Sequence, residues 1–344
     1  MPALPRAALL LLPVLLAPWA AACAPEADVV VYCALDQVHA EPLLKRFEDE
    51  TGLRVRAEFD VEAHKTVGLV ERIRAESGRP RCDVFWNNEI AHTVEMAGEG
   101  LLAAYDSPSA ADIPETFRDP ERRWTGFAAR ARVLIVNTEL VPDPSVVRGM
   151  QDLVDPLWAG RAGIAAPLTG TTLTHVTALY DVIGEEATRA WLRAIVDGDV
   201  AVTRGNAHVM KLVSTGELAW GFTDTDDLNV ALGNGQPVVA VYPDQKAALG
   251  EDAIGTLVIP NTVAVLAAAP HPDAARRLVD FVLSREVERE LAWSRSAQIP
   301  VRADVDRPAH VRSAAELDVM AVDWAHVGAT VRQRLAEHTE LFLE

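Results

Sequence analysis

The chain has 344 residues, of which 49% are hydrophobic, and it carries 50 acidic side chains against 32 Lys and Arg. The formal net charge of −18 would repel nucleic acid, so we exclude nucleic acid as a partner. The chain is longer than a single hydrophobic core usually grows. We therefore predict two lobes and, by default, a monomer.

The first 23 residues have the pattern of an export signal. Arg6 gives a charged start, residues 7–22 are almost wholly apolar, and three alanines lead directly into Cys23. These are the parts of a secretory signal peptide. Because a cysteine follows the expected cleavage site, we predict a lipoprotein signal over 1–22. Cys23 would then be lipidated and would anchor the mature protein at the periplasmic or extracytoplasmic face of the cell envelope.

Strand and helix patterns alternate through the next part of the chain. The continuous apolar run 29–32 is typical of a strand buried on both faces. Residues 53–59 alternate apolar with polar side chains, as a half-exposed strand does. Helices are predicted at 40–50 and 67–73, and a third strand at 84–86. This order predicts parallel strands joined by right-handed crossovers.

The same alternation continues to the C-terminus. Strands are predicted at 133–136, 164–166, 200–203, 219–222, 238–242, 257–259 and 262–267. Helices are predicted at 172–182, 185–196, 272–283, 286–293 and from Glu316 onward. Pro260 and Asn261 separate the last two predicted strands.

Two cysteines follow the signal segment. Cys33 ends the first predicted strand and Cys82 precedes the third, which places them at opposite edges of the sheet. Their Cα atoms would then lie beyond the roughly 7 Å that a disulfide tolerates, so we predict two buried thiols. The nine histidines form no pattern typical of a zinc site.

A loop able to hold an anion lies between the predicted strand 164–166 and the helix that follows it. Its residues are Thr169, Gly170, Thr171 and Thr172. They offer backbone N–H groups, hydroxyl groups and the positive end of a helix dipole. An ordinary helix N-cap would use the same residues, and the sequence leaves both interpretations open.

Three carboxylates in four residues follow the predicted strand 219–222. The segment is Asp224, Thr225, Asp226 and Asp227. Open α/β sheets bind ligands beyond the carboxyl ends of their strands. The carboxylates could accept hydrogen bonds from hydroxyl or ammonium groups, or coordinate a hard cation. Capping of the next helix by Asp224 or Thr225 accounts for only one of them.

Other polar residues also gather at predicted strand ends. They are Asp36 and Gln37, Asn88 and Glu89, and Asn206. Arg130 and Arg132 precede the strand 133–136 and point the same way on an extended chain, so they suit a carboxylate or phosphate. Their alternative role is an ion pair between lobes. No nucleophile with a base and no phosphate-binding P-loop occurs, so we predict a ligand cleft and no enzyme.

Several segments, taken in order, give the chain a family resemblance. They are VVVY, KRFEDETGLRVR, DVFW, TGFAARARVLIVNT, TGTT, GNAHV, GELAWGFTDTDD and TLVIPNTVAVL. Together with the export signal, they resemble the solute-binding proteins of ABC importers. The most similar group contains the ferric-ion-binding proteins and their hexose-phosphate and phosphonate relatives.

The resemblance implies a fold of the type II periplasmic-binding-protein kind. Two α/β lobes would be joined by two hinge strands, with the ligand cleft between them. Lobe 1 would comprise 28–129 with 262–344, and lobe 2 would comprise 130–261.

The resemblance also implies roles for the candidate residues. Thr169 to Thr172 would hold a phosphate or a helper anion beside Asn206. Arg130 and Arg132 would lie at the hinge near that anion. The facing lobe would contribute Asp36, Asn88 and Glu89.

The sequence departs from the iron-binding members at one place. Those members supply adjacent tyrosines where this chain has Thr225 and Asp226, and none of its four tyrosines has a tyrosine neighbour. Ferric iron would then need carboxylates and an anion, since it is a hard ion that prefers oxygen ligands. Asp226 and Glu89 are the candidate metal ligands.

The expected function is therefore that of an extracytoplasmic receptor for an ABC importer. It would capture ferric iron with an anion, or a small phosphorylated organic solute, and deliver it to a membrane permease. No cofactor is expected, with ferric iron only as cargo. The alternatives are a metal-assisted phosphate-ester hydrolase using Asp224, Asp226 and Asp227, and a periplasmic sensor without a transporter.

Overall fold

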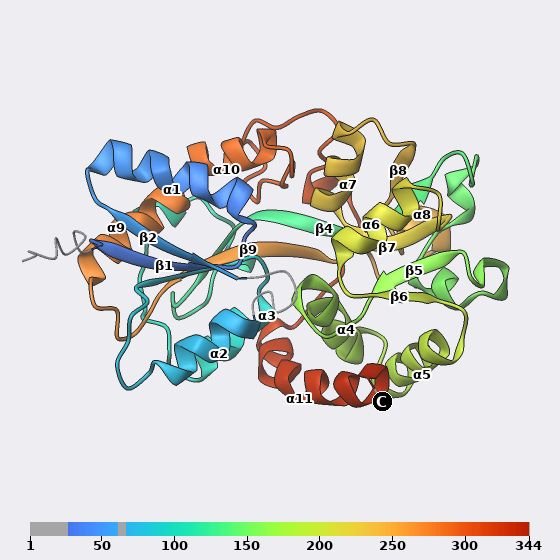
Figure 1. Cartoon of the computed structure of the whole chain (residues 1–344), viewed down its shortest axis with the longest axis horizontal. Coiled ribbons are helices and arrows are strands. Elements are labelled where there is room, and N and C mark those ends of the chain that lie inside the picture. Colours follow the sequence, from blue (N-terminus) through green and yellow to red (C-terminus); the bar gives the residue numbers. More distant parts are fainter. Residues whose placement is uncertain (1–26, 61–66, 344) are drawn as a thin grey trace, which may run out of the picture.

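The computed structural model describes residues 27–60 and 67–343. Within them the chain forms an elongated α/β molecule, with helices on both sides of the strands in each half (Figure 1). The predicted signal segment 1–22 and the predicted lipid anchor Cys23 lie outside the described residues. No helix among the described residues is both long enough and apolar enough to cross a bilayer.

One mixed sheet runs through the whole molecule, in the order β2-β1-β3-β9-β4-β7-β5-β6, with β8 paired to β4. Its strands are β1 (Val29–Cys33), β2 (Val55–Phe59), β3 (Val84–Asn87), β4 (Thr125–Asn137), β5 (Ala162–Ala165), β6 (Ala201–Thr203), β7 (Trp220–Asp224), β8 (Val238–Val241) and β9 (Val258–Val265). Strand β1 pairs in parallel with both β2 and β3, as the alternating pattern predicts. We call the part built on β1, β2 and β3 lobe 1, and the part built on β5 to β8 lobe 2.

Strand β4 belongs to both lobes. Its first part, from Thr125 to Ala131, pairs with β9 on either side of a bulge, whereas Arg132 to Val136 pair with β7 in lobe 2. All its residues are buried, and it is much longer than the predicted strand 133–136. The two arginines interrupt the apolar pattern, which is why the sequence shows only the C-terminal part. The division of lobes at 129/130 remains a prediction, although the pairing partners of β4 do change nearby.

The helices are α1 (Gln37–Thr51), α2 (Val67–Ala75), α3 (Ala91–Gly98), α4 (Gly170–Val182), α5 (Glu185–Asp197), α6 (Asn206–Ser214), α7 (Thr225–Gly233), α8 (Lys246–Leu249), α9 (Pro272–Val282), α10 (Arg285–Trp293) and α11 (Trp324–Leu343). Helix α11 packs against α3 of lobe 1 and α4 of lobe 2 (Figure 1). Its Val327 and Val331 share a small apolar cluster with Ala91 and Leu173. A Cβ atom at Gly328 would lie 2.6 Å from Val94, so this close packing requires glycine.

Two predicted boundaries are wrong. Pro260 and Asn261 do not separate two strands but lie inside β9, because the facing strand β4 takes up the irregularity as a bulge. The C-terminal helix begins at Trp324 rather than near Glu316. The intervening segment instead bonds to Thr256, whose N–H donates to Asp318 at 2.7 Å and whose carbonyl accepts from Met320 at 3.0 Å.

Both cysteines of the described chain are buried free thiols, as predicted. Cys33 ends β1 and Cys82 lies just before β3, at the other edge of the parallel strands.

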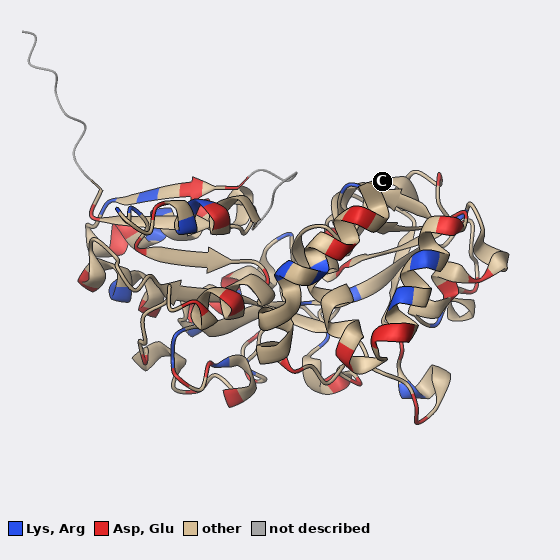
Figure 2. Ribbon diagram, turned by 90° about the horizontal axis from the view of Figure 1, so that it is seen from below, with Lys and Arg blue, Asp and Glu red and all other residues tan. Residues whose placement is uncertain are grey.

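Acidic residues are spread over both lobes rather than gathered in one patch (Figure 2). This distribution agrees with a general role of the negative charge in solubility.

Candidate functional site

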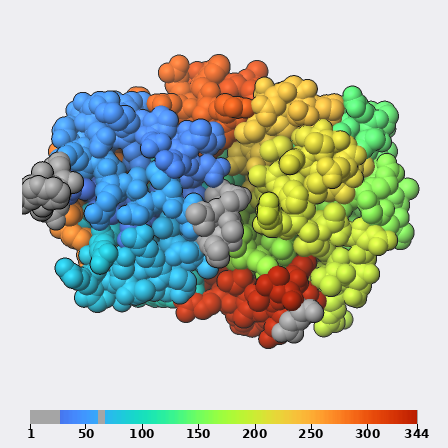
Figure 3. Space-filling model, in the orientation of Figure 1, coloured from blue at the N-terminus to red at the C-terminus, as the bar shows by residue number. Residues whose placement is uncertain are grey.

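A polar cleft lies at the carboxyl ends of β5, β6 and β7. It is lined by Asp36, Asn88, Arg130, Ala165, Ala166, Thr169, Gly170, Thr171, Thr172, Arg204, Gly205, Asn206, Ala207, Asp224, Asp226 and Asp227. Figure 3 shows the blue surface of lobe 1 and the yellow surface of lobe 2 facing each other across the middle of the molecule. The structure thus brings together most of the residues that the sequence singled out.

Three helices of lobe 2 begin at this cleft. Helix α4 follows Thr169, α6 follows Gly205 and α7 follows Asp224, and none of these three residues caps its helix with a side-chain hydrogen bond. The positive ends of three helix dipoles therefore converge on one region. Gly170, the first residue of α4, has a φ of 57°, which glycine adopts without strain.

The threonine hydroxyls beside the start of α4 are not N-caps. The hydroxyl of Thr171 donates to Asp224 Oδ2 at 2.5 Å, and that of Thr172 donates to Asn206 Oδ1 at 3.1 Å. They tie α4 to the end of β7 and to α6, and Thr169 makes no side-chain cap bond. Because no threonine side chain of this turn caps the helix, the arrangement favours an anion at the backbone N–H groups of the turn.

Asp224 is occupied by the protein itself. One of its oxygens accepts from Arg132 Nη1 at 2.8 Å, and the other accepts from Thr171 and from Asn206 Nδ2, the latter at 2.9 Å. Arg132 is fully buried and lies over the ring of Phe222. A buried cation of this kind needs a paired carboxylate, so Asp224 serves chiefly to neutralise Arg132.

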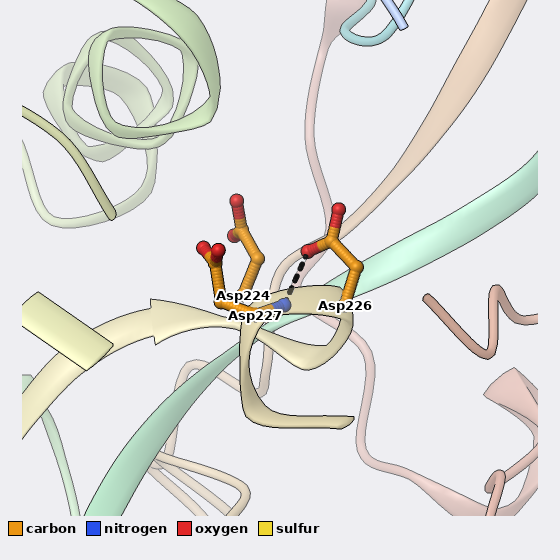
Figure 4. A group of neighbouring side chains, drawn as sticks. All are labelled: Asp224, Asp226 and Asp227. Atoms are coloured by element: carbon orange, nitrogen blue, oxygen red, sulfur yellow. Dashed lines mark hydrogen bonds between the residues drawn. The ribbon is translucent and has the colours of Figure 1, made fainter. Parts of the chain in front are cut away.

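Asp226 and Asp227 differ from Asp224 because they are only partly buried. Figure 4 shows the three carboxylates projecting from the turn between β7 and α7. Asp226 accepts from the backbone N–H of Asp227 at 3.1 Å, and Asp227 accepts from the hydroxyl of Thr223 at 3.0 Å. One oxygen of each of the three carboxylates lies within 4.8 Å of the others, a spacing that suits a single hard cation.

Arg130 brings a positive charge to these carboxylates from the hinge strand β4. Its Nη1 lies 3.4 Å from Asp226, and its Nη2 donates to Asn261 Oδ1 at 3.1 Å. Burial alone would lower the pKa of Arg130, but the carboxylates of Asp226, Asp224, Asp36 and Asp227 raise it above its usual range. Arg130 therefore stays charged in the cleft.

Arg204 is a cleft residue that sequence reasoning missed. It follows β6 directly, its side chain is exposed, and within the described residues it makes no ion pair. Its position at a strand end, just before Gly205 and Asn206, is the signal that would have found it. The cleft therefore has a positive region, formed by Arg204 and the helix starts, and a negative region around Asp226 and Asp227.

Four predicted residues do not line the cleft. Gln37 is exposed and donates to Glu41 at 3.2 Å, and Arg132 lies behind the surface, paired with Asp224. Thr225 is buried, and its hydroxyl accepts from the backbone N–H of Ala131 at 3.1 Å. Glu89, the predicted metal partner of Asp226, is also fully buried, and among the described residues the carboxylates grouped with Asp226 are Asp224 and Asp227.

Glu89 instead joins the two lobes. It accepts from Asn87 of lobe 1 and from the hydroxyl of Thr174 in lobe 2, both at 2.8 Å, and it pairs with His92 at 3.0 Å. Burial alone would raise the pKa of Glu89, but His92 and these hydrogen bonds lower it below its usual range. The carboxylate is thus a fixed charge between the lobes.

Comparison with known proteins places the chain among solute-binding proteins. Residues 92–327 match the sequence profile of the family described as bacterial extracellular solute-binding protein. The chain is 27% identical over 267 residues to iron uptake protein A1 of Synechocystis, covering 76% of this chain and 72% of that protein.

Solved structures are also similar. Iron-bound HitA from Pseudomonas aeruginosa superposes with a TM-score of 0.81 at 24% identity, covering 91% of this chain and 99% of that one. AfuA from Actinobacillus pleuropneumoniae, with exogenous fructose-6-phosphate bound, gives 0.77 at 22% identity, with 90% and 97% covered. These similarities confirm the predicted fold of two α/β lobes in the type II periplasmic-binding arrangement.

Proposed function

The chain belongs to the bacterial extracellular solute-binding protein family, and from this premise we propose that its cleft captures a solute with two oppositely charged parts for an ABC importer. Members of this family are transport components and not enzymes, so the hydrolase alternative has no support. The receptor would close its lobes on the solute and present it to a membrane permease.

The two-ended charge pattern of the cleft carries this proposal. The starts of α4 and α6, with Arg204, provide backbone N–H groups and a cation for an anionic group. Asp226 and Asp227 provide carboxylate oxygens for a cation, an ammonium group or hydroxyl groups. A cargo that carries both kinds of group would be held at both ends.

The first candidate cargo is ferric iron together with an anion. It is supported by the cluster of three carboxylates, because ferric iron prefers hard oxygen ligands. It is also supported by the relatives, which include iron uptake protein A1 of Synechocystis. The anion would lie at the start of α4, between the protein and the iron.

The second candidate cargo is a small phosphorylated organic solute. Its support is that no tyrosine occurs among the described residues that line the cleft, whereas two arginines do. Arg130 next to Asp226 also opposes a bare cation there. The phosphate would occupy the start of α4, and hydroxyl or ammonium groups would contact Asp226 and Asp227.

A thermal-shift screen of the mature, metal-stripped protein tests both candidates. The probes are ferric citrate, citrate alone, inorganic phosphate, hexose phosphates and aminoalkylphosphonates. A probe at a hundred times its Kd should add about 2.7 kcal/mol to the stability of the folded state. If only ferric citrate raises the melting temperature, the cargo is iron. If only the organic phosphates raise the melting temperature, the cargo is that of the second candidate. No shift with any probe would contradict both.

The proposal includes the anchor and the oligomeric state. Cys23 would carry the lipid, and the body of the protein would be a monomer outside the membrane. Expression with labelled palmitate tests the anchor, with Cys23→Ser as the variant and Cys33→Ser as the control. Label that persists in the Cys23 variant would contradict the proposed anchor, and light scattering of the mature protein would test the monomer.

A further inference from the structure

The hinge strand β4 carries an extra residue at the point where it crosses between the lobes. Phe127 is paired with Asn261 of β9, but Arg130 is paired with Ile259, so two residues of β4 face one residue of β9. The two bulged residues of β4 are Ala128 and Ala129, and the residue of β9 opposite them is Pro260. Proline has no backbone N–H to give to a sheet, and within sheets it is found at such bulges.

The bulge is fully hydrogen-bonded despite leaving the β9 ladder. The N–H of Ala128 donates to Glu288 Oε1 at 3.1 Å, and its carbonyl accepts from Asn261 Nδ2. The N–H and carbonyl of Ala129 both pair with Ile299, at 2.6 and 2.7 Å. Every backbone group of the two residues therefore has a partner outside the ladder, which marks the bulge as a built feature.

Ala128 adopts a backbone conformation that alanine disfavours. Its φ is 40°, in the left-handed region where the Cβ atom crowds the carbonyl oxygen. Two fully buried side chains, Glu288 and Asn261, hold it there from either side. Glu288 is itself fixed by Arg302 at 2.8 Å. Strained backbone of this kind persists only where the surroundings enforce it, and it gathers at functional sites.

The extra residue decides which face of β4 carries the arginines. Paired residues of neighbouring strands point to the same face, so Arg130 shares a face with Ile259, and hence with Asn261 two residues along. If β4 ran through this point without a bulge, with all its residues in the ladder, Arg130 would pair with Val258 and point to the opposite face. A one-residue change of register reverses every side chain that follows, including Arg132.

We propose that the bulge at Ala128 and Ala129 directs Arg130 into the cleft, and that Asn261 is a positioning residue for the ligand. Asn261 bonds Arg130 and the carbonyl of Ala128 at once, and Gln298 holds its amide at 2.8 Å. It acts on the ligand only through Arg130, since it does not line the cleft. The consequence for affinity rests on the proposed function.

A double-mutant cycle tests this role, with ferric citrate and inorganic phosphate as probes in titration calorimetry. Asn261→Ala should weaken the binding of whichever probe the wild type binds by about tenfold, the scale of a lost charge-assisted hydrogen bond. In the Arg130→Gln background the same change should cost less than about twofold. An equal loss in both backgrounds would overturn the proposal.

Asn137→Ala is the matched control. Asn137 is a buried asparagine at the end of β4, and its Nδ2 donates to the carbonyl of Val213 at 2.9 Å. It lies far from Arg130 along that strand. Both variants lose buried hydrogen bonds and should melt at lower temperature, but only the Asn261 variant should lose affinity. A similar loss of affinity in both variants would show a general structural effect and contradict the positioning role.

A crystal structure of the ligand-free Asn261→Ala protein tests the proposal without any ligand. Arg130 should leave its position 3.4 Å from Asp226, and an unchanged Arg130 would overturn the role. If the wild type binds neither ferric citrate nor inorganic phosphate, this crystal structure alone decides the inference, whatever the cargo is. If Asn261→Ala does not fold, the smaller change Asn261→Ser takes its place in both experiments.

Discussion

The two faces of the cleft are built in different ways. Lobe 2 contributes three helix starts, a threonine turn, Arg204 and the carboxylates, whereas lobe 1 contributes only Asp36 and Asn88 among the described lining residues. The lobe 2 face is also tied together by Asp224, which bonds residues of three different elements. A preformed face of this kind loses little order on binding, so we expect lobe 2 to take the solute first and lobe 1 to close over it.

The largest effect should come from the lobe 2 carboxylate whose oxygens are bonded by the protein itself. Asp224→Asn removes the counter-charge of the fully buried Arg132 and should lower the free energy of unfolding by about 3 kcal/mol. Asp36→Asn replaces an exposed carboxylate of the lobe 1 face and should change the free energy of unfolding by less than about 0.5 kcal/mol. Urea unfolding of the two variants measures this difference. Similar losses would mean that the two faces are equally ordered.

The pH dependence should differ between buried carboxyls of the two lobes. Burial raises the pKa of Asp244 in lobe 2 from 3.8 to about 7. Because its folded pKa is the higher one, its contribution to stability is lost as the pH rises from about 4 to 7. Relative to Asp244→Asn, the wild type should therefore lose about 1.4 kcal/mol for each unit of pH within this range.

Glu89 should behave in the opposite way, since its pKa in the folded protein is lowered. Its contribution is present above its unfolded value of 4.5 and is lost as the pH falls through the folded pKa. Urea unfolding of the wild type, Asp244→Asn and Glu89→Gln at a series of pH values measures the direction in which each carboxyl changes the stability with pH. A wild type that gains stability over Asp244→Asn as the pH rises would contradict the first prediction.

A smaller effect is expected where the lobe 2 face contacts the solute. Asp226→Asn should weaken binding by about tenfold, which corresponds to about 1.4 kcal/mol. The reason is that Asp226 is partly exposed and faces the cleft. The ligand-free variant should stay folded and lose less stability than Asp224→Asn, because Asp224, Asp36 and Asp227 still compensate the charge of Arg130. Titration calorimetry with the probe found in the screen measures the affinity. Unchanged affinity would remove Asp226 from the site.

The smallest expected difference is between the affinity losses of two substitutions by uncharged residues, one on each face of the cleft. Arg204→Gln should weaken binding by about fivefold, and the loss should shrink at high salt because Arg204 is exposed. Asn88→Ala in lobe 1 should cost about twofold, since it meets the solute only after closure. Titrations at low and high salt compare the two variants. A larger loss for Asn88→Ala would reverse the proposed order of the two faces.

The sequence predicted the parts of the fold that depend on local pattern. Runs such as 29–32 and the alternation over 53–59 marked β1 and β2, because side-chain period reports directly on a strand's faces. The residues after β7 were found for a similar reason, since strand ends at a sheet edge are read from order alone. Arg204 met the same criterion and was missed.

The errors arise where a distant segment decides the outcome. Pro260 is a local signal for a break, and only the bulge in β4, more than a hundred residues away, lets β9 continue through it. Glu89 follows β3 as a cleft residue would, but His92 and Thr174 hold it in the interior. The contact with Thr174 cannot be inferred from one strand's pattern, because Thr174 lies on a helix of the other lobe and meets Glu89 only through tertiary packing.

The place of β9 in the sheet has a consequence for how the chain folds. Strand β9 lies between β3 and β4, yet it is the last of the described strands to be synthesised. The lobe 2 partners of β4, which are β7 and β8, both precede β9 in the chain. Lobe 2 can therefore complete its strand pairing first, while β3 keeps an open edge until residues 258–265 arrive. Such long-range pairing is slow, and exposed edges promote aggregation. We expect refolding to show a fast phase from lobe 2 and a slow phase from the insertion of β9.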